Sequence, residues 1–332
     1  MTPLFALDDL TVRIGPAQIV SGVSWSVEPG QTLGIVGESG SGKSMSVLAA
    51  TGLVPRPPAV IGGRALLGAG EQQLDLLSMS ARQLQQVRGR RIGFVFQDPA
   101  SSLNPLLTVE KLLSEPMRAH LDLDRTALRR RALELLELVG IPDPERRLKA
   151  YPHELSGGMR QRVMIAIALS CDPEVLIADE PTTALDVTIQ AQIISVVRDL
   201  QERLGTAVVW ISHDLGVIGG IADNVVVCYG GQVVEEAPMD VLYRRHRHPY
   251  TRGLFAARPT LGEFDQPLST IPGSPPDPRN LPPGCIFWDR CEVRTDPSCE
   301  TERPALVEVA PDHRVRTRCV LPDLGPMSGG AG

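Results

Sequence analysis

The sequence has no long hydrophobic run. No stretch approaches the roughly 18 to 20 uninterrupted apolar residues that a membrane-spanning helix needs. The first ten residues also lack the basic-then-apolar order of a secretory signal, because Asp8 and Asp9 interrupt them. We therefore expect a soluble, cytoplasmic chain, whose work at a membrane would require partner proteins.

An excess of positive charge is also missing. Lysine and arginine number 33 against 39 aspartates and glutamates, which gives a formal net charge of −6. Proteins that follow a nucleic-acid backbone usually carry a basic face. The basic cluster from Arg244 to His248 is too short to change this balance. Nucleic acid is therefore not expected to be the main partner.

Cysteine is scarce over most of the chain and concentrated at its end. Cys171 and Cys228 lie in apolar surroundings and are predicted to be small core residues. The other four crowd into the last fifth of the sequence: Cys285, Cys291, Cys299 and Cys319. In a reducing compartment such a cluster favours metal binding over disulfides.

The chain is long enough for one large α/β domain and a smaller appendage, with 332 residues of which 42% are hydrophobic. Residues 1–30 show short alternating apolar runs, typical of antiparallel edge strands. Buried strands are predicted at 32–36, 175–178 and 207–211, and helices at 45–53, 125–139 and 189–204. This alternation predicts a mostly parallel sheet covered on both faces, with a helical insertion at about 80–165.

The composition changes after residue 258. Eight prolines lie between Pro259 and Pro283, a density that excludes a packed helix or a central strand. We therefore predict three parts: an α/β domain over 1–258, a proline-rich arm with a four-cysteine extension over 259–320, and a disordered tail over 321–332.

A phosphate-binding loop is predicted at Gly37–Ser44, which fits G-x-x-x-x-G-K-[ST] after a buried strand and before a helix. Glycines let the backbone curl so that N–H groups face phosphate oxygens. Lys43 would reach the β- and γ-phosphates, and Ser44 would ligate Mg²⁺. The remaining contacts would come from the loop backbone, at Gly37, Ser39, Gly40, Ser41 and Gly42.

Two carboxylates follow the predicted strand at 175–178. Asp179 would hold Mg²⁺, directly or through a water molecule. Glu180 would point elsewhere, because strand side chains alternate, and could polarise the attacking water. Together with the phosphate loop, this pair predicts a nucleoside triphosphatase.

The segment Leu155–Gln161, LSGGMRQ, resembles the signature loop of ABC ATPases, with Met159 where glutamine is more usual. Other motifs of that family stand around it in the family's order: Phe96–Pro99 resembles the Q-loop, Ala184–Asp186 the D-loop, and Ile211–Asp214 the segment of the switch histidine. Six motifs in the correct order over residues 37–213 make coincidence negligible. No internal repeat is visible, so the chain carries one ATPase unit.

The resemblance implies ATP and Mg²⁺ as ligands and a head-to-tail pair of ATPase subunits. Ser156 with Gly157 and Gly158 would contact the γ-phosphate of an ATP bound by the other subunit. Gln97 would sense the γ-phosphate, Mg²⁺ and water, His213 would contact the γ-phosphate, and Asp186 would organise the paired interface. The family usually stacks an aromatic residue on adenine, but here that position falls to Ile14, so weaker stacking is expected.

The last part of the chain resembles the C-terminal extension of dipeptide and oligopeptide importer ATPases, the peptide/nickel family. The matching pieces are His248–Thr251, Gly253-Leu254, Ile271–Gly273, Gly284-Cys285 and Arg290-Cys291. This implies an ATPase at the cytoplasmic face of the plasma membrane that powers peptide import. Its partners would be a second, related ATPase, two permease subunits and an extracytoplasmic substrate-binding protein. Nickel, glutathione or another small solute is the alternative cargo, and a soluble nucleic-acid-associated ABC ATPase is the more distant alternative.

The four C-terminal cysteines are separated by 5, 7 and 19 residues. Zinc ribbons usually offer close C-x₂₋₄-C pairs, and none is present. Some peptide-importer ATPases of this kind carry a four-iron four-sulfur cluster, and four thiolates suit such a cluster. The resemblance therefore favours an iron–sulfur cluster. Zinc, or an unmetallated structural cluster, remains open.

Overall fold

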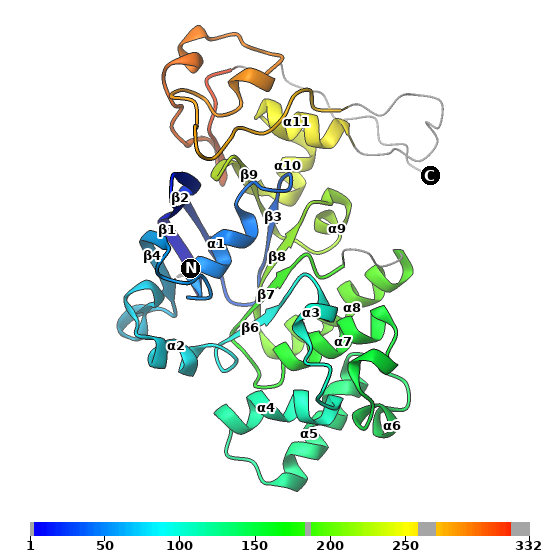
Figure 1. The fold of residues 1–332 in the computed structure, drawn as a ribbon. Coiled ribbons are helices and arrows are strands. Elements are labelled where there is room, and N and C mark those ends of the chain that lie inside the picture. Colours follow the sequence, from blue (N-terminus) through cyan, green and yellow to red (C-terminus); the bar gives the residue numbers. More distant parts are fainter. Residues whose placement is uncertain (1–2, 183–186, 258–269, 320–332) are drawn as a thin grey trace. The chain divides into compact units, whose positions relative to one another are not determined.

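The computed structural model describes residues 3–182, 187–257 and 270–319, which form two compact units (Figure 1). The first unit comprises residues up to 6, residues 26–32 and residues 66–212. The second comprises residues 7–25 and 33–65 and the chain from 213 onward. The predicted tail at 321–332 and the start of the proline-rich arm lie outside the described residues.

Three buried parallel strands form the centre of the first unit. They are β6 (Ile92–Val95), β7 (Val175–Asp179) and β8 (Ala207–Ser212), in the order β6-β7-β8. Every residue of β7 and β8 is buried, as their continuous apolar runs predict. The register sets Val95 beside Ala178, and Asp179 beside Ile211. The residues that follow β6 and β7 therefore emerge at one edge of these strands.

Helices make up most of the rest of the first unit. They are α2 (Ala81–Val87), α3 (Pro99–Ser102), α4 (Val109–His120), α5 (Arg125–Leu138), α6 (Pro144–Leu148), α7 (Gly157–Ala168) and α8 (Val187–Leu204). In α5, Leu128, Leu135 and Leu136 are buried, as is Val139 directly after the helix. The predicted helical insertion also contains β6, because the short run Ile92–Val95 pairs with β7.

The second unit carries a strand order of β3-β9-β10-β12-β11. The strands β3 (Thr32–Val36) and β9 (Asn224–Tyr229) are parallel, whereas β10 (Gln232–Pro238), β12 (His313–Val315) and β11 (Val307–Ala310) add in antiparallel fashion. The sheet is therefore mixed, and the end of the chain is built into it through β12.

A hairpin precedes the phosphate loop. It consists of β1 (Phe5–Ile14) and β2 (Ala17–Val27), which turn at Gly15 with a φ of +56°. With 10 and 11 residues, both strands are longer than the short apolar runs within residues 1–30 suggested. β4 (Ala59–Leu67) lies beside β1, and its last residues pair with the short β5 (Leu74–Asp75).

The helices of the second unit are α1 (Lys43–Ala50), α9 (Leu215–Gly219), α10 (Met239–Arg245) and α11 (Pro249–Ala256). α1 ends before the predicted residue 53, because Gly52 adopts a left-handed conformation with a φ of +69°. Between residues 270 and 306 the chain forms only two short 3₁₀ turns, at Trp288–Arg290 and Pro297–Glu300. None of the described helices is long and apolar enough to cross a membrane.

A buried carboxylate joins β12 to the body of the second unit. Glu235, on β10, is fully buried, and it accepts hydrogen bonds from the backbone N–H groups of Arg247 at 2.6 Å and His248 at 3.0 Å. Nε2 of His313, on β12, donates to it at 2.8 Å. Burial alone would raise the pKa of Glu235, but these hydrogen bonds outweigh it and hold the pKa below its usual value.

Replacing Glu235 by glutamine should lower the free energy of unfolding by about 3 kcal/mol, because an amide cannot accept all of these bonds. The neighbouring Glu236 provides a matched control. Burial raises its pKa, and its ion pair with Arg314 is partly exposed, so Glu236→Gln should cost less than about 1 kcal/mol. Urea unfolding measures both variants.

The pH dependence of the Glu235 effect has a defined sign. Because the folded-state pKa of Glu235 is depressed, its contribution is complete above the ordinary value of 4.5 and disappears as the pH falls through the folded-state value. The difference between wild type and Glu235→Gln should therefore shrink in acid. Equal costs for the two glutamine variants at neutral pH would contradict this interpretation.

Candidate nucleotide-binding and hydrolysis site

The phosphate loop of the second unit follows the path that its glycines allow. Gly37, Gly40 and Gly42 have φ values of +152°, +79° and +89°, a region that favours glycine. A Cβ at Gly37 would lie 2.1 Å from the carbonyl oxygen of Cys228, so the loop runs directly against the end of β9. The loop then enters α1 at Lys43, as the motif predicts.

Lys43 is buried within its own loop. Its Nζ donates to the carbonyl oxygens of Gly37 at 2.7 Å and Glu38 at 2.9 Å, and it lies 3.4 Å from Oγ of Ser41. These bonds turn the loop carbonyls toward the ammonium group. Ser44 is half-buried in the first turn of α1, while Ser39 and Gly40 are exposed at the tip of the loop.

Two residues that are distant in the sequence hold Glu38, the second residue of this loop, in place. The Glu38 N–H donates to the hydroxyl of Tyr250 at 2.8 Å, and burial raises the pKa of that hydroxyl, which stays neutral. The Glu38 carboxylate accepts two hydrogen bonds from Arg290, at 2.6 and 3.0 Å. Neither residue is among those that the sequence predicts at the nucleotide site. Both lie in pieces that carried the resemblance, which was the only signal available.

The first unit brings two predicted catalytic residues into contact. Nε2 of Gln97 donates to Oε2 of Glu180 at 3.0 Å. Gln97 comes two residues after β6 and Glu180 directly after β7, so the parallel pairing of these strands places both at one edge. Asp179 and Glu180 are both buried. This edge combines two carboxylates with an amide that can position a water molecule.

Glu180 reaches its position by a different route from the one expected. β7 ends at Asp179, and Glu180 adopts a left-handed conformation with a φ of +48°. Its N–H still donates to the carbonyl of Ile211 on β8 at 3.0 Å. A turn of the backbone, rather than strand alternation alone, therefore directs this side chain, and positive φ at a non-glycine residue is common at functional sites.

The signature segment forms the start of α7. Ser156 caps this helix by accepting a hydrogen bond from the N–H of Met159 at 3.3 Å. Ser156 and Gly157 are exposed, and no atom lies within 4 Å of a Cβ built on Gly157. An exposed helix start with small residues offers backbone N–H groups to an anion that approaches from outside the subunit.

Two other predicted site residues, His213 and Ile14, lie in the second unit. His213 follows β8, is exposed, and precedes Asp214, which caps α9. Ile14 ends β1 and is half-buried beside the hairpin turn. Asp186, with the rest of the predicted D-loop, lies outside the described residues.

Two family descriptions match the chain. The ABC transporter family matches residues 20–183, and the C-terminal region of oligopeptide/dipeptide transporters matches residues 234–299. The oligopeptide transport ATP-binding protein OppD of Bacillus subtilis is 45% identical over 328 residues, which cover 97% of this chain and 90% of that protein. The chain belongs to the family of oligopeptide ABC transporter ATP-binding proteins.

Other members of this family are similarly close. AppD of Bacillus subtilis, also described as an oligopeptide transport ATP-binding protein, is 47% identical and covers 88% of each chain. OppD of Mycobacterium bovis is 46% identical over 98% of this chain, which spans only 53% of that longer protein. The peptide-transporter family predicted from the sequence is therefore confirmed.

Solved structures agree with this family. The dimeric ATP-binding cassette MJ0796, bound to ADP and Pi after hydrolysis, matches with a TM-score of 0.63 and 28% identity, over 71% of this chain and 98% of that one. CbiO1 from Clostridium perfringens, part of the transporter complex cbiONQ, matches with a TM-score of 0.62 and 26% identity, over 73% of this chain and 91% of that one. The chain has the fold of an ABC ATPase nucleotide-binding domain, as predicted.

The four C-terminal cysteines of this ABC ATPase influence one another. Burial, followed by the charge of Cys319, raises the pKa of Cys299 to about 11. Burial also raises the pKa of Cys285, and Cys291 and Cys319 add smaller contributions. The Cys285 N–H donates to the Cys299 carbonyl at 2.7 Å. Even so, residues 3–182, 187–257 and 270–319 contain no group of three or more potential ligands arranged to hold a metal ion. The predicted iron–sulfur cluster has no ready-made site there.

The two other cysteines are core residues, as predicted. Cys171 and Cys228 are buried, and burial raises the pKa of the Cys228 thiol to about 12. A thiol that stays protonated is a poor nucleophile and metal ligand. Cys228 therefore contributes to the phosphate loop through its backbone carbonyl, which packs against Gly37.

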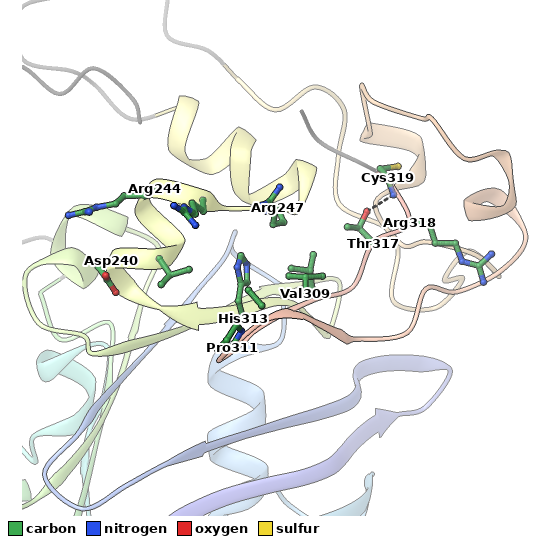
Figure 2. Close-up of a pocket in the computed structure, with 13 residues that line it drawn as sticks. Asp240, Arg244, Arg247, Val309, Pro311, His313, Thr317, Arg318 and Cys319 are labelled. Carbon is green, nitrogen blue, oxygen red and sulfur yellow. Dashed lines mark hydrogen bonds between the residues drawn. The ribbon is translucent and has the colours of Figure 1, made fainter. Parts of the chain in front are cut away.

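The second unit also has an open cavity of about 730 Å³ between α10 and the β11–β12 strands (Figure 2). Its lining includes Arg244, Arg247, Arg318 and the buried His313. Arg244 and Arg318 lie at opposite ends of the view in Figure 2, so these cations do not converge on one point. Asp240 is the one carboxylate in the described lining of the cavity, and the lining has no amide–carboxylate contact like that of Gln97 and Glu180.

The contact between Gly37 and Cys228 yields a test of the loop. Gly37→Ala should lower the free energy of unfolding by more than about 3 kcal/mol, because the new Cβ collides with backbone. Gly40→Ala places its Cβ in open space and should cost only about 1 kcal/mol, from its positive φ. Urea unfolding of the two variants measures the difference, and equal costs would refute the close packing.

Proposed function

We propose that this chain is the ATP-hydrolysing subunit of a transporter that imports dipeptides and oligopeptides. The observation that carries the proposal is the contact between Gln97 and Glu180 at the end of two buried parallel strands, in a chain that also has a well-formed phosphate loop. An amide bonded to a carboxylate is suited to orient a water molecule for attack on a phosphoryl group.

The phosphate loop binds the triphosphate of ATP. Backbone N–H groups from Gly37 to Ser44 surround the phosphate oxygens, and the start of α1 adds its dipole. Lys43 contacts the β- and γ-phosphates. Ile14 covers the adenine with an apolar but non-aromatic surface, which weakens base stacking.

Oxygen donors of this chain suit Mg²⁺. The Ser44 hydroxyl and the Gln97 side-chain oxygen are hard ligands, and the buried Asp179 carboxylate can hold the ion through its water. Bound Mg²⁺ neutralises charge on the β- and γ-phosphates.

Hydrolysis depends on side chains that orient water and hold charge. Glu180 accepts the proton of the attacking water, and Gln97 keeps the Glu180 carboxylate in place through its 3.0 Å bond. His213 contacts the γ-phosphate. Because little covalent chemistry falls to the protein, positioning and electrostatics supply most of the rate.

A second ATPase subunit completes the site. Ser156, Gly157 and Gly158 meet the ATP of the neighbouring subunit, and Asp186 organises the interface between the two. The exposed start of α7 supports this arrangement, because its backbone N–H groups are accessible to a nucleotide bound by another subunit. The second subunit is a related chain.

The remaining partners are two membrane-embedded permease subunits and an extracytoplasmic substrate-binding protein. The permeases hold the chain at the cytoplasmic face of the plasma membrane. Residues 1–258 supply the ATPase domain, with its helical part at about 80–165, and residues 259–320 supply the extension. The names of the relatives support peptides, rather than nickel or glutathione, as the cargo.

Glu180→Gln should leave ATP binding intact and lower ATP turnover by at least about 100-fold, because the amide cannot take the proton from water. Uptake of a labelled tripeptide by cells that carry only this variant should fall with it. Glu174→Gln is the matched control and should keep ATP turnover. Glu174 lies directly before β7, at the end opposite Glu180, and pairs with Arg91. Turnover that survived in Glu180→Gln would remove Glu180 from the mechanism.

We also propose that the four C-terminal cysteines bind a metal group, with a four-iron four-sulfur cluster favoured over zinc. Supporting this is the all-thiol donor set, with four free cysteines within residues 285–319. A bound cluster would act as a staple for a segment that has few regular elements.

An iron–sulfur cluster should give anaerobically purified protein an absorbance band near about 400 nm and about four irons per chain. Cys299→Ser should lose most of this iron, whereas Cys171→Ser, in the core of the other unit, should keep it. Zinc in place of iron would identify the alternative metal, and the absence of both metals would refute metal binding.

A further inference from the structure

Arg290 connects the C-terminal extension to the phosphate loop. Its side chain is only 4% exposed, and it forms two parallel hydrogen bonds to the Glu38 carboxylate, Nη1 to Oε2 at 2.6 Å and Nη2 to Oε1 at 3.0 Å. This fork geometry gives both energy and a fixed orientation. The carboxylate that it holds belongs to the second residue of the phosphate loop.

The other donors of Arg290 are also used. Nε donates to the carbonyl of Pro272 at 2.7 Å, and Nη2 donates to the carbonyl of Ile271 at 3.2 Å. Nη1 also lies 3.3 Å from the hydroxyl of Tyr229, at the end of β9. A guanidinium has five N–H donors, and the bonds to these partners match that number. The carbonyls of Pro272 and Ile271, in the extension, thus fix the orientation of the Arg290 side chain toward the loop.

Glu38 places a negative charge in a loop that is proposed to bind a triphosphate. Its negative charge would repel the phosphates unless a cation neutralised it. Lys43 is bonded to the carbonyl of Glu38, not to its carboxylate. Tyr250 is neutral and holds only the Glu38 N–H. Among the described residues, the guanidinium of Arg290 is the cation that the hydrogen bonds place on this carboxylate.

Within the second unit, the extension makes a further contact close in sequence to a predicted nucleotide contact. The N–H of Gln18, on β2, donates to the carbonyl of Pro278 at 2.8 Å. Gln18 lies just after the hairpin turn that follows Ile14, the predicted adenine contact. Residues 271–290 therefore contact both the hairpin and the phosphate loop.

We propose that Arg290 is a positioning residue for the phosphate loop: it neutralises Glu38 and holds it in place, so that the loop is pre-organised to bind ATP. The inference rests on the proposed function, in which this loop binds ATP. It makes the C-terminal extension a part of the nucleotide site, in addition to any role in holding metal.

The test measures the dissociation constant of the full-length chain for ATP, by calorimetry. Arg290→Ala should raise this constant about tenfold or more, because it leaves an uncompensated carboxylate in the loop. Arg290→Lys should fall between wild type and Arg290→Ala, since lysine cannot form two parallel bonds. Arg279→Ala is the matched control: Arg279 forms a forked pair with Asp277 in the same extension, and its loss should leave the constant unchanged.

A rescue separates positioning from a purely structural role. Adding Glu38→Gln to Arg290→Ala removes the unpaired charge and should restore ATP binding to within about threefold of wild type. If Arg290 served only to fold the extension, Glu38→Gln would not restore binding. Such a failure, or a wild-type dissociation constant in Arg290→Ala, would overturn the inference.

Urea unfolding of each variant monitors stability. Should Arg290→Ala fail to fold, Arg290→Lys decides, because it keeps the charge but not the two parallel bonds. It must bind ATP more weakly than wild type, and a wild-type dissociation constant in this variant would overturn the inference. A wild-type chain that bound no ATP would instead overturn the proposed function, and this inference with it.

Discussion

The buried ammonium group of Lys43 determines the arrangement of the phosphate loop. A buried cation is costly unless its donors are satisfied, and here the carbonyls of Gly37 and Glu38 satisfy two of them at 2.7 and 2.9 Å. To point these carbonyls inward the loop must curl tightly, and only glycine tolerates the resulting φ values at Gly37 and Gly42 without strain. The glycines are therefore required because Lys43, at the start of α1, must have its buried charge satisfied by loop carbonyls.

The same loop depends on residues that are distant in sequence. The end of β9 supplies the Cys228 carbonyl against which Gly37 packs, and the N–H of Gly231 donates to the carbonyl of Ser41 at 3.1 Å. Tyr250 and Arg290 hold Glu38 through its N–H group and its carboxylate, respectively. The nucleotide loop of this ABC ATPase is supported by its C-terminal region, which the family comparison matches separately, over residues 234–299.

In the first unit, strand pairing brings together two residues of the proposed hydrolysis site. Gln97 and Glu180 are 83 positions apart, yet the parallel register of β6 and β7 brings their side chains to 3.0 Å. The sequence motifs predict both residues but no contact between them. Strand alternation predicts the direction of the Glu180 side chain, whereas the backbone turns there with a φ of +48°. Local periodicity cannot reveal such a turn, because glutamate has no preference for it.

Much of the fold and of the phosphate loop was determined by the sequence alone. Continuous apolar runs predicted the buried strands β3, β7 and β8, glycine spacing predicted the phosphate loop, and the order of the motifs identified the family. These features are local: they follow from backbone sterics, side-chain period and residue order. Only the tertiary structure decided which residues support the loop. Arg290, Tyr250 and Glu38 are joined by hydrogen bonds across as many as 252 positions, and no local pattern records which side chains meet after the chain has folded.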